Sequence, residues 1–403
     1  MVPMTDLDTF SALLAPEGQE LLAALRDHDP ADELATATRL RRDHPAPLVS
    51  AALGQARLRQ RAAAKFGPDA ARMYFTPNGV EQSTRAPVAA HRAARLAALG
   101  VRSLADLCCG IGGDALALAR AGIRVLAVDR DPLACAAARA NAAALDLADR
   151  IEVRCADVTE VDTAGYDAVF VDPARRGGVR GGRIFDPEAY SPPLSWAVAA
   201  ARSAPYAALK IAPGVPHEAL PEDAETEWIS DGGDVKEAVV WFGTGLPGAR
   251  RATLLPSGDS LVGAAPPDDD EAHRPPVGPV GGWLHEPDGA VIRAHLVADV
   301  AERVGGRLID PTIAYVTADE LVPTPYATAY AVTDVLPFNV KKLRALLRER
   351  EVGVAVIKKR GSAVEPEELR RKLKLAGPHS CTVFLTRVAG APAMLLGHPA
   401  PAA

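Results

Sequence analysis

The sequence predicts an α/β fold in which a mostly parallel β-sheet is covered by helices on both faces. From about residue 86, short apolar runs typical of strands alternate with helical repeats of alanine, leucine and arginine. The connections between these segments are short, which favours consecutive strand–helix–strand units. A glycine-rich turn, DLCCGIGGD at 106–114, separates the first strand from its helix. Together these observations indicate a doubly wound sheet with a ligand site at one edge.

The segment before the sheet, 1–85, is expected to be a helical domain. Apolar residues recur at helical spacing through 20–29, 32–44 and 49–66, and prolines separate the repeats. The segment 73–84, MYFTPNGVEQST, follows as a turn-rich connector.

The next segment, 86–255, is expected to form the sheet domain. Its expected helices are 88–99, 115–122, 132–145 and 191–203, and its expected strands are 103–107, 123–129, 151–157, 166–172 and 206–212. Two further strands, 236–242 and 250–257, are joined by a short turn. Such a turn requires an antiparallel pair, because parallel neighbours need a long crossover. The sheet should therefore end in an antiparallel hairpin.

The remaining chain predicts a linker and a third domain. Residues 256–289 are rich in proline, glycine and acids, which indicates a linker. Residues 290–403 alternate short helices and strands and predict a small α+β domain. Within it, 341–374 contains twelve Lys/Arg and five Glu. This excess fits either a solvated helix face or a phosphate-binding face.

The composition excludes several classes of protein. The 403 residues carry a net charge of −6, so any nucleic-acid surface must be a local patch. No uncharged apolar run is long enough to span a membrane. The acidic N-terminus lacks a signal-peptide pattern, and the five cysteines show no C-x-x-C spacing. We expect a cytoplasmic protein with reduced thiols and no metal site.

Acids stand at four consecutive strand ends, around the glycine turn. Asp129 lies 19 residues past Gly110, where a carboxylate can accept both ribose hydroxyls. Asp157 could accept from an adenine amine. Asp106 would repel a pyrophosphate but suits a ligand with an ammonium and a sulfonium. Each acid alone also fits a loop or cap, but with Asp172 the set favours S-adenosylmethionine.

These residues resemble the class I, Rossmann-like methyltransferases, and in particular the trimethylguanosine synthase branch. The likeness covers roughly 75–185 and includes the Cys-Gly-hydrophobic-Gly-Gly turn, a strand ending in Asp-x-Asp-Pro, and an Ala-Arg-x-Asn-Ala helix. FTPNGVEQST resembles that branch's Phe-x-x-Thr-Pro segment, which implies substrate contacts at Phe75 and Thr76. The resemblance implies these cofactor contacts: Asp106, Cys108, Gly110 and Gly112 at the methionine end, Asp129 at the ribose and Asp157 at the adenine.

The substrate motif departs from that branch. Its N-methyltransferases carry Ser/Asn/Asp-Pro-Pro and an aromatic ring, whereas VFVDPARRGG has Asp172-Pro173-Ala174-Arg175. Asp172 can accept a hydrogen bond from an exocyclic amine and hold its lone pair in line with a methyl group. Pro173 is expected beside the substrate. Arg175 either stacks on a base or binds a phosphate, or it faces solvent. Lys210 and Lys236 either line the pocket or pair with nearby acids.

The segment 356–387 resembles the THUMP-like domain of uncharacterised bacterial members of this group. True THUMP domains bind RNA, so the resemblance implies RNA as a partner, through the basic 341–374 face. The sequence therefore predicts an S-adenosylmethionine-dependent methyltransferase acting on an RNA base nitrogen. Two alternatives stay open. One is a non-catalytic RNA-binding protein on a methyltransferase scaffold, and the other is a nucleotide-dependent oxidoreductase.

Overall fold

The computed structural model describes residues 6–175, 187–264 and 275–401. The chain divides into two compact units. The first comprises 1–225 with 238–247, and the second comprises 226–237 with 248–403. Among the described residues, no helix has the length and apolar character needed to cross a bilayer.

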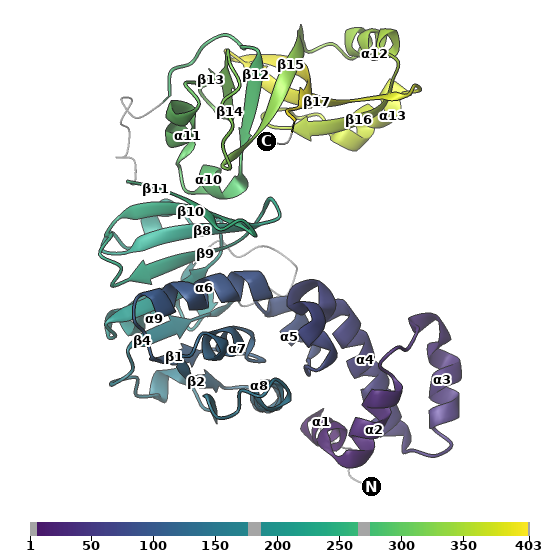
Figure 1. Cartoon of the computed structure of the whole chain (residues 1–403), viewed down its shortest axis with the longest axis vertical. Helices are drawn as coiled ribbons and strands as arrows, with labels where there is room; N and C mark the ends of the chain where they lie inside the picture. Colours follow the sequence, from purple (N-terminus) through teal and green to yellow (C-terminus); the bar gives the residue numbers. More distant parts are fainter. Residues whose placement is uncertain (1–5, 176–186, 265–274, 402–403) are drawn as a thin grey trace. The chain divides into compact units, whose positions relative to one another are not determined.

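The first unit begins with α-helices, of which α2 (Pro16–Ala24), α4 (Ala46–Phe66) and α5 (Pro77–Gln82) carry a proline in their first turn (Figure 1). Proline is favoured in the first helical turn because its missing N–H would have no partner there. The predicted N-terminal helical region is thus confirmed. The region also contains α1 (Asp6–Leu14) and α3 (Glu33–Leu40).

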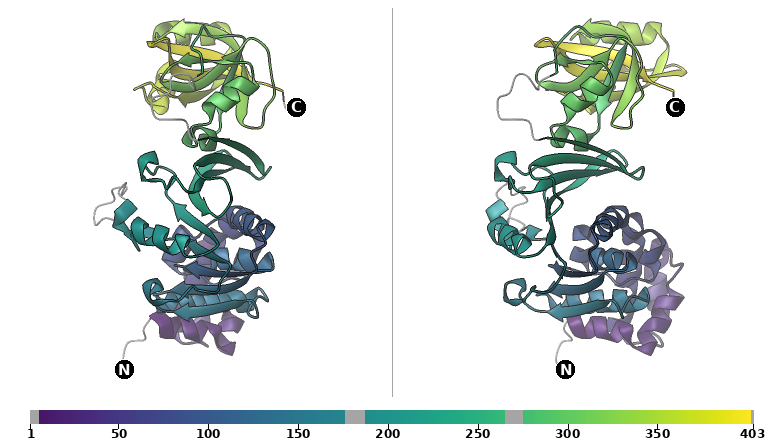
Figure 2. Two further views of the ribbon diagram at one scale, coloured as in Figure 1. Left: turned by 90° about the vertical axis from the view of Figure 1, so that its left-hand side faces the viewer. Right: turned by 60° about the vertical axis from the view of Figure 1, so that its left-hand side comes forward.

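The sheet of the first unit is the predicted doubly wound α/β sheet. Its strands are six neighbours of a nine-stranded sheet, in the order β9-β7-β4-β1-β2-β3, and the pairs from β7 to β3 are parallel. Figure 2 shows helices on both faces, with α9 opposite α6 and α7. The strands are β1 (Ser103–Leu107), β2 (Arg124–Asp129), β3 (Ile151–Cys155), β4 (Ala168–Val171), β7 (Tyr206–Ile211) and β9 (Asp234–Phe242). The helices are α6 (Ala86–Ala98), α7 (Gly113–Arg120), α8 (Pro132–Ala144) and α9 (Leu194–Arg202).

The expected pairing of 236–242 with 250–257 is wrong. The neighbours of β10 (Ala249–Leu255) are β8 (Glu225–Asp231), which is parallel to it, and β11 (Asp259–Ala264), which is antiparallel. The antiparallel neighbour of β7 is β9. The strand β8 was missed because its sequence, ETEWISD, is polar, yet Glu225, Thr226 and Glu227 are all fully buried.

The second unit contains a seven-stranded sheet with order β13-β14-β12-β15-β18-β17-β16. Its strands are β12 (Trp283–Pro287), β13 (Arg307–Asp310), β14 (Ile313–Ala318), β15 (Ala327–Pro337), β16 (Val352–Lys359), β17 (His379–Val388) and β18 (Ala391–Pro399). Its helices are α10 (Gly289–Arg293), α11 (Val297–Arg303), α12 (Val340–Glu349) and α13 (Pro366–Leu373). Two strands form where the sequence predicted a linker, β11 and β12. The strands β13 and β18 were not predicted.

The basic stretch 341–374 comprises nearly all of α12, the edge strand β16 and α13, and both helices pack on this second sheet. Leucines 343 and 347 of α12 and leucines 369 and 373 of α13 are buried in one cluster with residues of β16 and β17. Because these helices bury their leucines, their lysines and arginines lie on the opposite, exposed side.

Candidate active site

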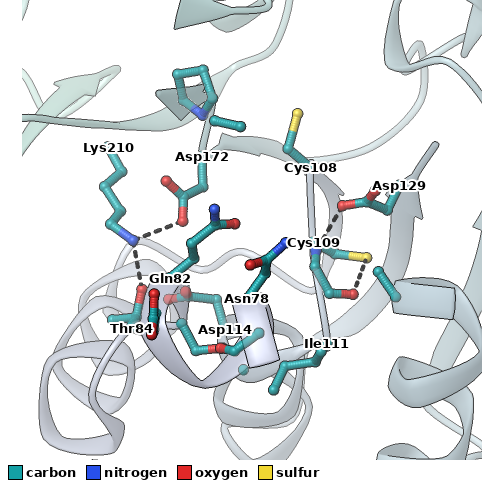
Figure 3. Close-up of a pocket in the computed structure, with 18 of the residues that line it drawn as sticks. Asn78, Gln82, Thr84, Cys108, Cys109, Ile111, Asp114, Asp129, Asp172 and Lys210 are labelled. Carbon is teal, nitrogen blue, oxygen red and sulfur yellow. Dashed lines mark hydrogen bonds and ion pairs between the residues drawn. The ribbon is translucent and has the colours of Figure 1, made fainter. Parts of the chain in front are cut away.

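A cavity of about 500 Å³ opens at the carboxyl ends of the parallel strands of the first unit. The glycine turn forms one side of the cavity, and Asp172 and Lys210 form another (Figure 3). Five of the predicted site residues line it directly, besides Pro173: Thr76, Cys108, Gly110, Asp129 and Asp172. The sequence therefore located the cavity, although not all of its walls.

The glycine turn is held by hydrogen bonds to β2. The amides of Cys108 and Cys109 both donate to the Val128 carbonyl, at 2.9 and 3.0 Å. Gly110 and Gly112 have φ values of +54° and +84°, a region that glycine adopts without Cβ strain. Cys108 has φ of +70° without being glycine, which is a strained conformation typical of functional sites.

The thiols of this turn are held in their neutral form. Burial raises the pKa of Cys108 above its ordinary value, and the Asp129 and Asp172 carboxylates raise it further. Burial raises the pKa of Cys109 in the same way. Both thiols are therefore protonated at neutral pH.

Asp129 links the turn to the start of α8. Its Oδ2 accepts from the Gly110 amide at 2.9 Å, and its Oδ1 accepts from the Asp131 amide at 2.9 Å. It lines the cavity with half-buried oxygens that can accept further bonds. Asp157 is exposed. Its Oδ1 accepts hydrogen bonds from the Thr159 amide and hydroxyl, at 2.9 and 2.7 Å. These hydrogen bonds lower the pKa of Asp157, and the residue is not part of the cavity wall.

Asp106 lies beneath the cavity and is completely buried. Neither of its carboxyl oxygens has a hydrogen-bond partner among the residues that the structure describes. Burial raises the pKa of Asp106 well above its ordinary value; the carboxylates of Asp114 and Asp172 add to this, and Arg92 opposes it. A buried acid without a partner is costly in its charged form, so burial favours the protonated form of Asp106.

Asp172 follows β4 and pairs with Lys210. The Lys210 ammonium donates to Asp172 Oδ2 at 2.7 Å and to the Thr84 hydroxyl at 3.0 Å. Both alternatives for Lys210 therefore hold, since it lines the cavity and also pairs with an acid. Lys236 pairs with exposed Asp234 at 3.1 Å instead.

Behind Lys210 lies a second buried ion pair. Arg92 Nε donates to Asp114 Oδ1 at 3.0 Å, and the arginine side chain is only 1% exposed. Burial alone would raise the pKa of Asp114, but the charges of Arg92 and Lys210 and the Thr84 hydrogen bond lower it overall. The wall of the cavity at Lys210 is thus supported by a buried ion pair, Arg92 with Asp114.

Some predicted residues lie elsewhere. Phe75 is 2% exposed and packs its ring against Phe66, at 5.5 Å between centroids. Its neighbour Thr76 lines the cavity and caps α5, with Oγ1 accepting from the Gly79 amide at 2.9 Å. Gly112 lies in the turn without lining the cavity. The side chain of Arg175 lies outside the described residues.

Several wall residues were missed from the sequence. Asn78 and Gln82 project from successive turns of α5 toward the space beside Asp172 (Figure 3). Tyr190 reaches the wall because its strand pairs with 174–175, with Arg175 opposite Tyr190. The spacing of Asn78 and Gln82, four residues apart on a helix, was a signal that could have placed them on one face. Nothing in the sequence could place Tyr190.

The described residues contain no group of three or more His, Cys, Asp or Glu side chains arranged to hold a metal ion.

Three segments of the chain match known families. Residues 104–174 match the family described as a methyltransferase domain, and residues 327–399 match the THUMP domain-like family. Residues 6–62 match a domain family of unknown function.

Relatives extend this match over most of the chain. A Mycobacterium tuberculosis protein, described as an uncharacterized S-adenosylmethionine-dependent methyltransferase, is 38% identical over 343 residues, which is 82% of this chain and 90% of the relative. The 23S rRNA (uracil(1939)-C(5))-methyltransferase of Acidithiobacillus ferrooxidans is 36% identical over 80 residues, or 18% of each chain. The crystal structure of a methyltransferase candidate from Porphyromonas gingivalis W83 covers 98% of this chain and 99% of its own, with a TM-score of 0.78 and 21% identity. That last likeness shows the shared fold.

Fold, cavity and relatives define a class I S-adenosylmethionine-dependent methyltransferase. The chain belongs to the same methyltransferase family as the Mycobacterium tuberculosis protein, with a THUMP-like domain at 327–399. Its cofactor is S-adenosylmethionine, and the residues present fit that group. The carboxyl groups of Asp129 and Asp172, which both line the cavity, favour a cation over a pyrophosphate.

Proposed function

We propose that this enzyme methylates a base nitrogen of RNA, with Asp172 as the residue that holds the nucleophile. The observation that carries this proposal is that the Asp172 carboxylate faces the same cavity as the glycine turn. We also propose kinship with the trimethylguanosine synthase branch, because Thr76 and the glycine turn line the same cavity.

The cofactor would lie along the glycine turn. We propose that the turn at Gly110 and Gly112, with Cys108 and Asp106, holds its methionine end. The Asp129 carboxylate would accept from the ribose hydroxyls, and Asp157 remains the proposed acceptor for the adenine amine. Bound there, the cofactor supplies a methyl group on a positively charged sulfur.

The substrate would enter beside Asp172. Its carboxylate can accept the N–H of an exocyclic amine and so hold the nitrogen lone pair toward the methyl group. The proton that the nitrogen loses can leave through this carboxylate, whose side chain is 28% exposed. Pro173 lies in the wall next to it, and Tyr190 supplies the aromatic ring that the Asp-Pro-Ala-Arg sequence lacks. Arg175 would stack on a base or bind a phosphate of the substrate.

RNA as the substrate is supported by the second unit. Most of the lysines and arginines of α12 and α13 are exposed, and such a surface attracts a phosphate backbone. The THUMP-like family match and the 80-residue likeness to an rRNA methyltransferase point the same way.

The test is mass spectrometry of nucleosides from rRNA and tRNA of a deletion strain and its parent. We expect one methylated base to be lost on deletion and restored by the wild-type gene, but not by a gene carrying Asp172→Ala. Identical nucleoside profiles in deletion strain and parent would contradict an rRNA or tRNA substrate.

A further inference from the structure

Lys210 and Asp172 stand side by side because parallel strands hold them in register. The last paired residues of β4 and β7 are Val171 and Leu209, and each is followed by one of the two charged residues. The lysine side chain is 12% exposed and the aspartate side chain 28%. The lysine therefore lies deeper, and the aspartate lies nearer the open side of the cavity.

Lys210 is itself held from behind. Its ammonium donates to Thr84 Oγ1, and that hydroxyl bonds in turn to the buried Asp114 carboxylate. Asp114 is paired with Arg92, whose guanidinium lies 4.4 Å from the centroid of the Phe170 ring. Because these groups are buried and mutually bonded, Lys210 has little freedom to move.

We propose that Lys210 is a positioning residue for methyl transfer, whose ammonium holds Asp172 Oδ2 so that Oδ1 is presented to the substrate N–H. This inference rests on the function proposed above, in which Asp172 receives that hydrogen bond. Lys210 does not touch the reacting atoms in this role. It acts through Asp172.

The charges around Asp172 explain why a cation is needed there. Asp106 and Asp114 belong to the same cluster of acids, and the charge of Asp172 contributes to the raised pKa of Asp106. Without the lysine, Asp172 Oδ2 would lose the ammonium that holds it, and the side chain would turn toward the open side of the cavity. A misplacement of about 1 Å in such a group costs on the order of 100-fold in rate.

The activity test uses three variants and a defined probe. The probe is total RNA from the deletion strain, incubated with methyl-tritiated S-adenosylmethionine. Lys210→Met, which removes the charge at similar length, should lower kcat by about 100-fold and leave the dissociation constant for S-adenosylhomocysteine within about threefold. Lys210→Arg should restore part of kcat, because a guanidinium can still donate to Oδ2. Lys236→Met is the matched control, since it breaks an exposed lysine–aspartate pair, and should transfer methyl at the wild-type rate.

Two outcomes of that test would overturn the inference. One is a Lys210→Met variant with wild-type kcat. The other is an equal loss of cofactor affinity and transfer, which would mean that Lys210 serves the cofactor or the fold. If the wild-type enzyme labels no RNA, the proposed function fails, and a second measurement still decides the role of Lys210.

That second measurement needs no substrate. Crystal structures of the wild type and Lys210→Met, each with S-adenosylhomocysteine, should show the Asp172 carboxylate displaced in the variant, while Thr84 and Asp114 keep their places. An Asp172 side chain in the same position in both structures would overturn the inference.

Discussion

Charged residues are concentrated in two regions of this molecule, which differ in how far the charges are buried and bonded to one another. At the strand ends of the first unit, Asp172, Lys210, Thr84, Asp114 and Arg92 form one bonded series, most of it buried. In 341–374, most lysines and arginines are exposed, and the ion pairs there are separate from one another, such as Arg370 with Glu367.

This difference shows that the number of charged residues in a region does not predict whether they form a reactive site. A buried, connected charge is fixed in position and shifts the pKa of its neighbours, as Asp106 shows. An exposed charge is screened by salt and can be replaced by another. We therefore expect single substitutions to have large effects at the strand ends and small ones on α12 and α13.

The largest expected effect comes from Asp172→Ala. It removes the proposed acceptor for the substrate N–H and should lower kcat by about 1000-fold. The affinity for S-adenosylmethionine should change by less than about threefold, because the remaining contacts proposed for the cofactor are untouched. Calorimetry with the cofactor and tritium transfer to RNA measure the two effects. Equal loss of both would refute the role given to Asp172.

A smaller effect is expected from Asp129→Ala. The substitution removes the proposed ribose acceptor and also the hydrogen bonds to the amides of Gly110 and Asp131. Two charge-assisted hydrogen bonds of about 1.5 kcal/mol each correspond to roughly 100-fold in the dissociation constant for S-adenosylmethionine. Asp157→Ala removes the proposed adenine acceptor, which lies outside the cavity wall, and should weaken cofactor binding less than Asp129→Ala does. If Asp157→Ala weakened cofactor binding more than Asp129→Ala does, Asp129 would not be the stronger of the two proposed contacts.

Asp106→Asn tests the buried acid through the pH dependence of stability. Burial raises the pKa of Asp106 above its unfolded value, and Asp114 and Asp172 add to this. The folded protein then binds more protons than the unfolded chain, so this group's contribution to stability falls as pH rises from its unfolded pKa toward its folded pKa. The variant lacks that loss. The free energy of unfolding of the variant, minus that of the wild type, should therefore increase as pH rises, by up to about 1.4 kcal/mol per pH unit. Urea unfolding between pH 5 and 8 measures it, and parallel curves for the two proteins would contradict the raised pKa.

The smallest effects should come from the basic helices. Each of Lys341→Gln, Lys342→Gln and Lys372→Gln should weaken RNA binding only severalfold and lower the salt slope by about one. Filter binding at several salt concentrations measures this, and the cofactor affinity should stay at the wild-type value. A single substitution that abolished RNA binding would mean that this region is a built site rather than an additive surface.

The sequence predicted the sheet of the first unit well, for a physical reason. Buried parallel strands are continuous apolar runs, such as Val169–Val171, and they stand out against alanine-rich helices. The polar strand β8 was missed because its buried glutamates and threonine resemble a surface segment. The hairpin assignment failed as a consequence, since β10 then had no visible partner except β9.

The site was predicted in part. Acids at strand ends could be found because parallel strands bring their carboxyl ends to one edge, which placed Asp129 and Asp172 in the cavity wall. The burial of each acid could not be predicted from the sequence. In the structure, Asp106 is buried and Asp157 is exposed. The partnership of Lys210 with Thr84 spans 126 residues and depends on tertiary packing.

One measurement tests the central claim most directly, namely a crystal structure of the wild-type enzyme with S-adenosylhomocysteine. We predict that the ligand lies along the 108–112 turn, with its ribose hydroxyls on Asp129 and its sulfur facing the Asp172 carboxylate. Ligand density away from this turn, or a sulfur atom facing away from Asp172, would contradict the account.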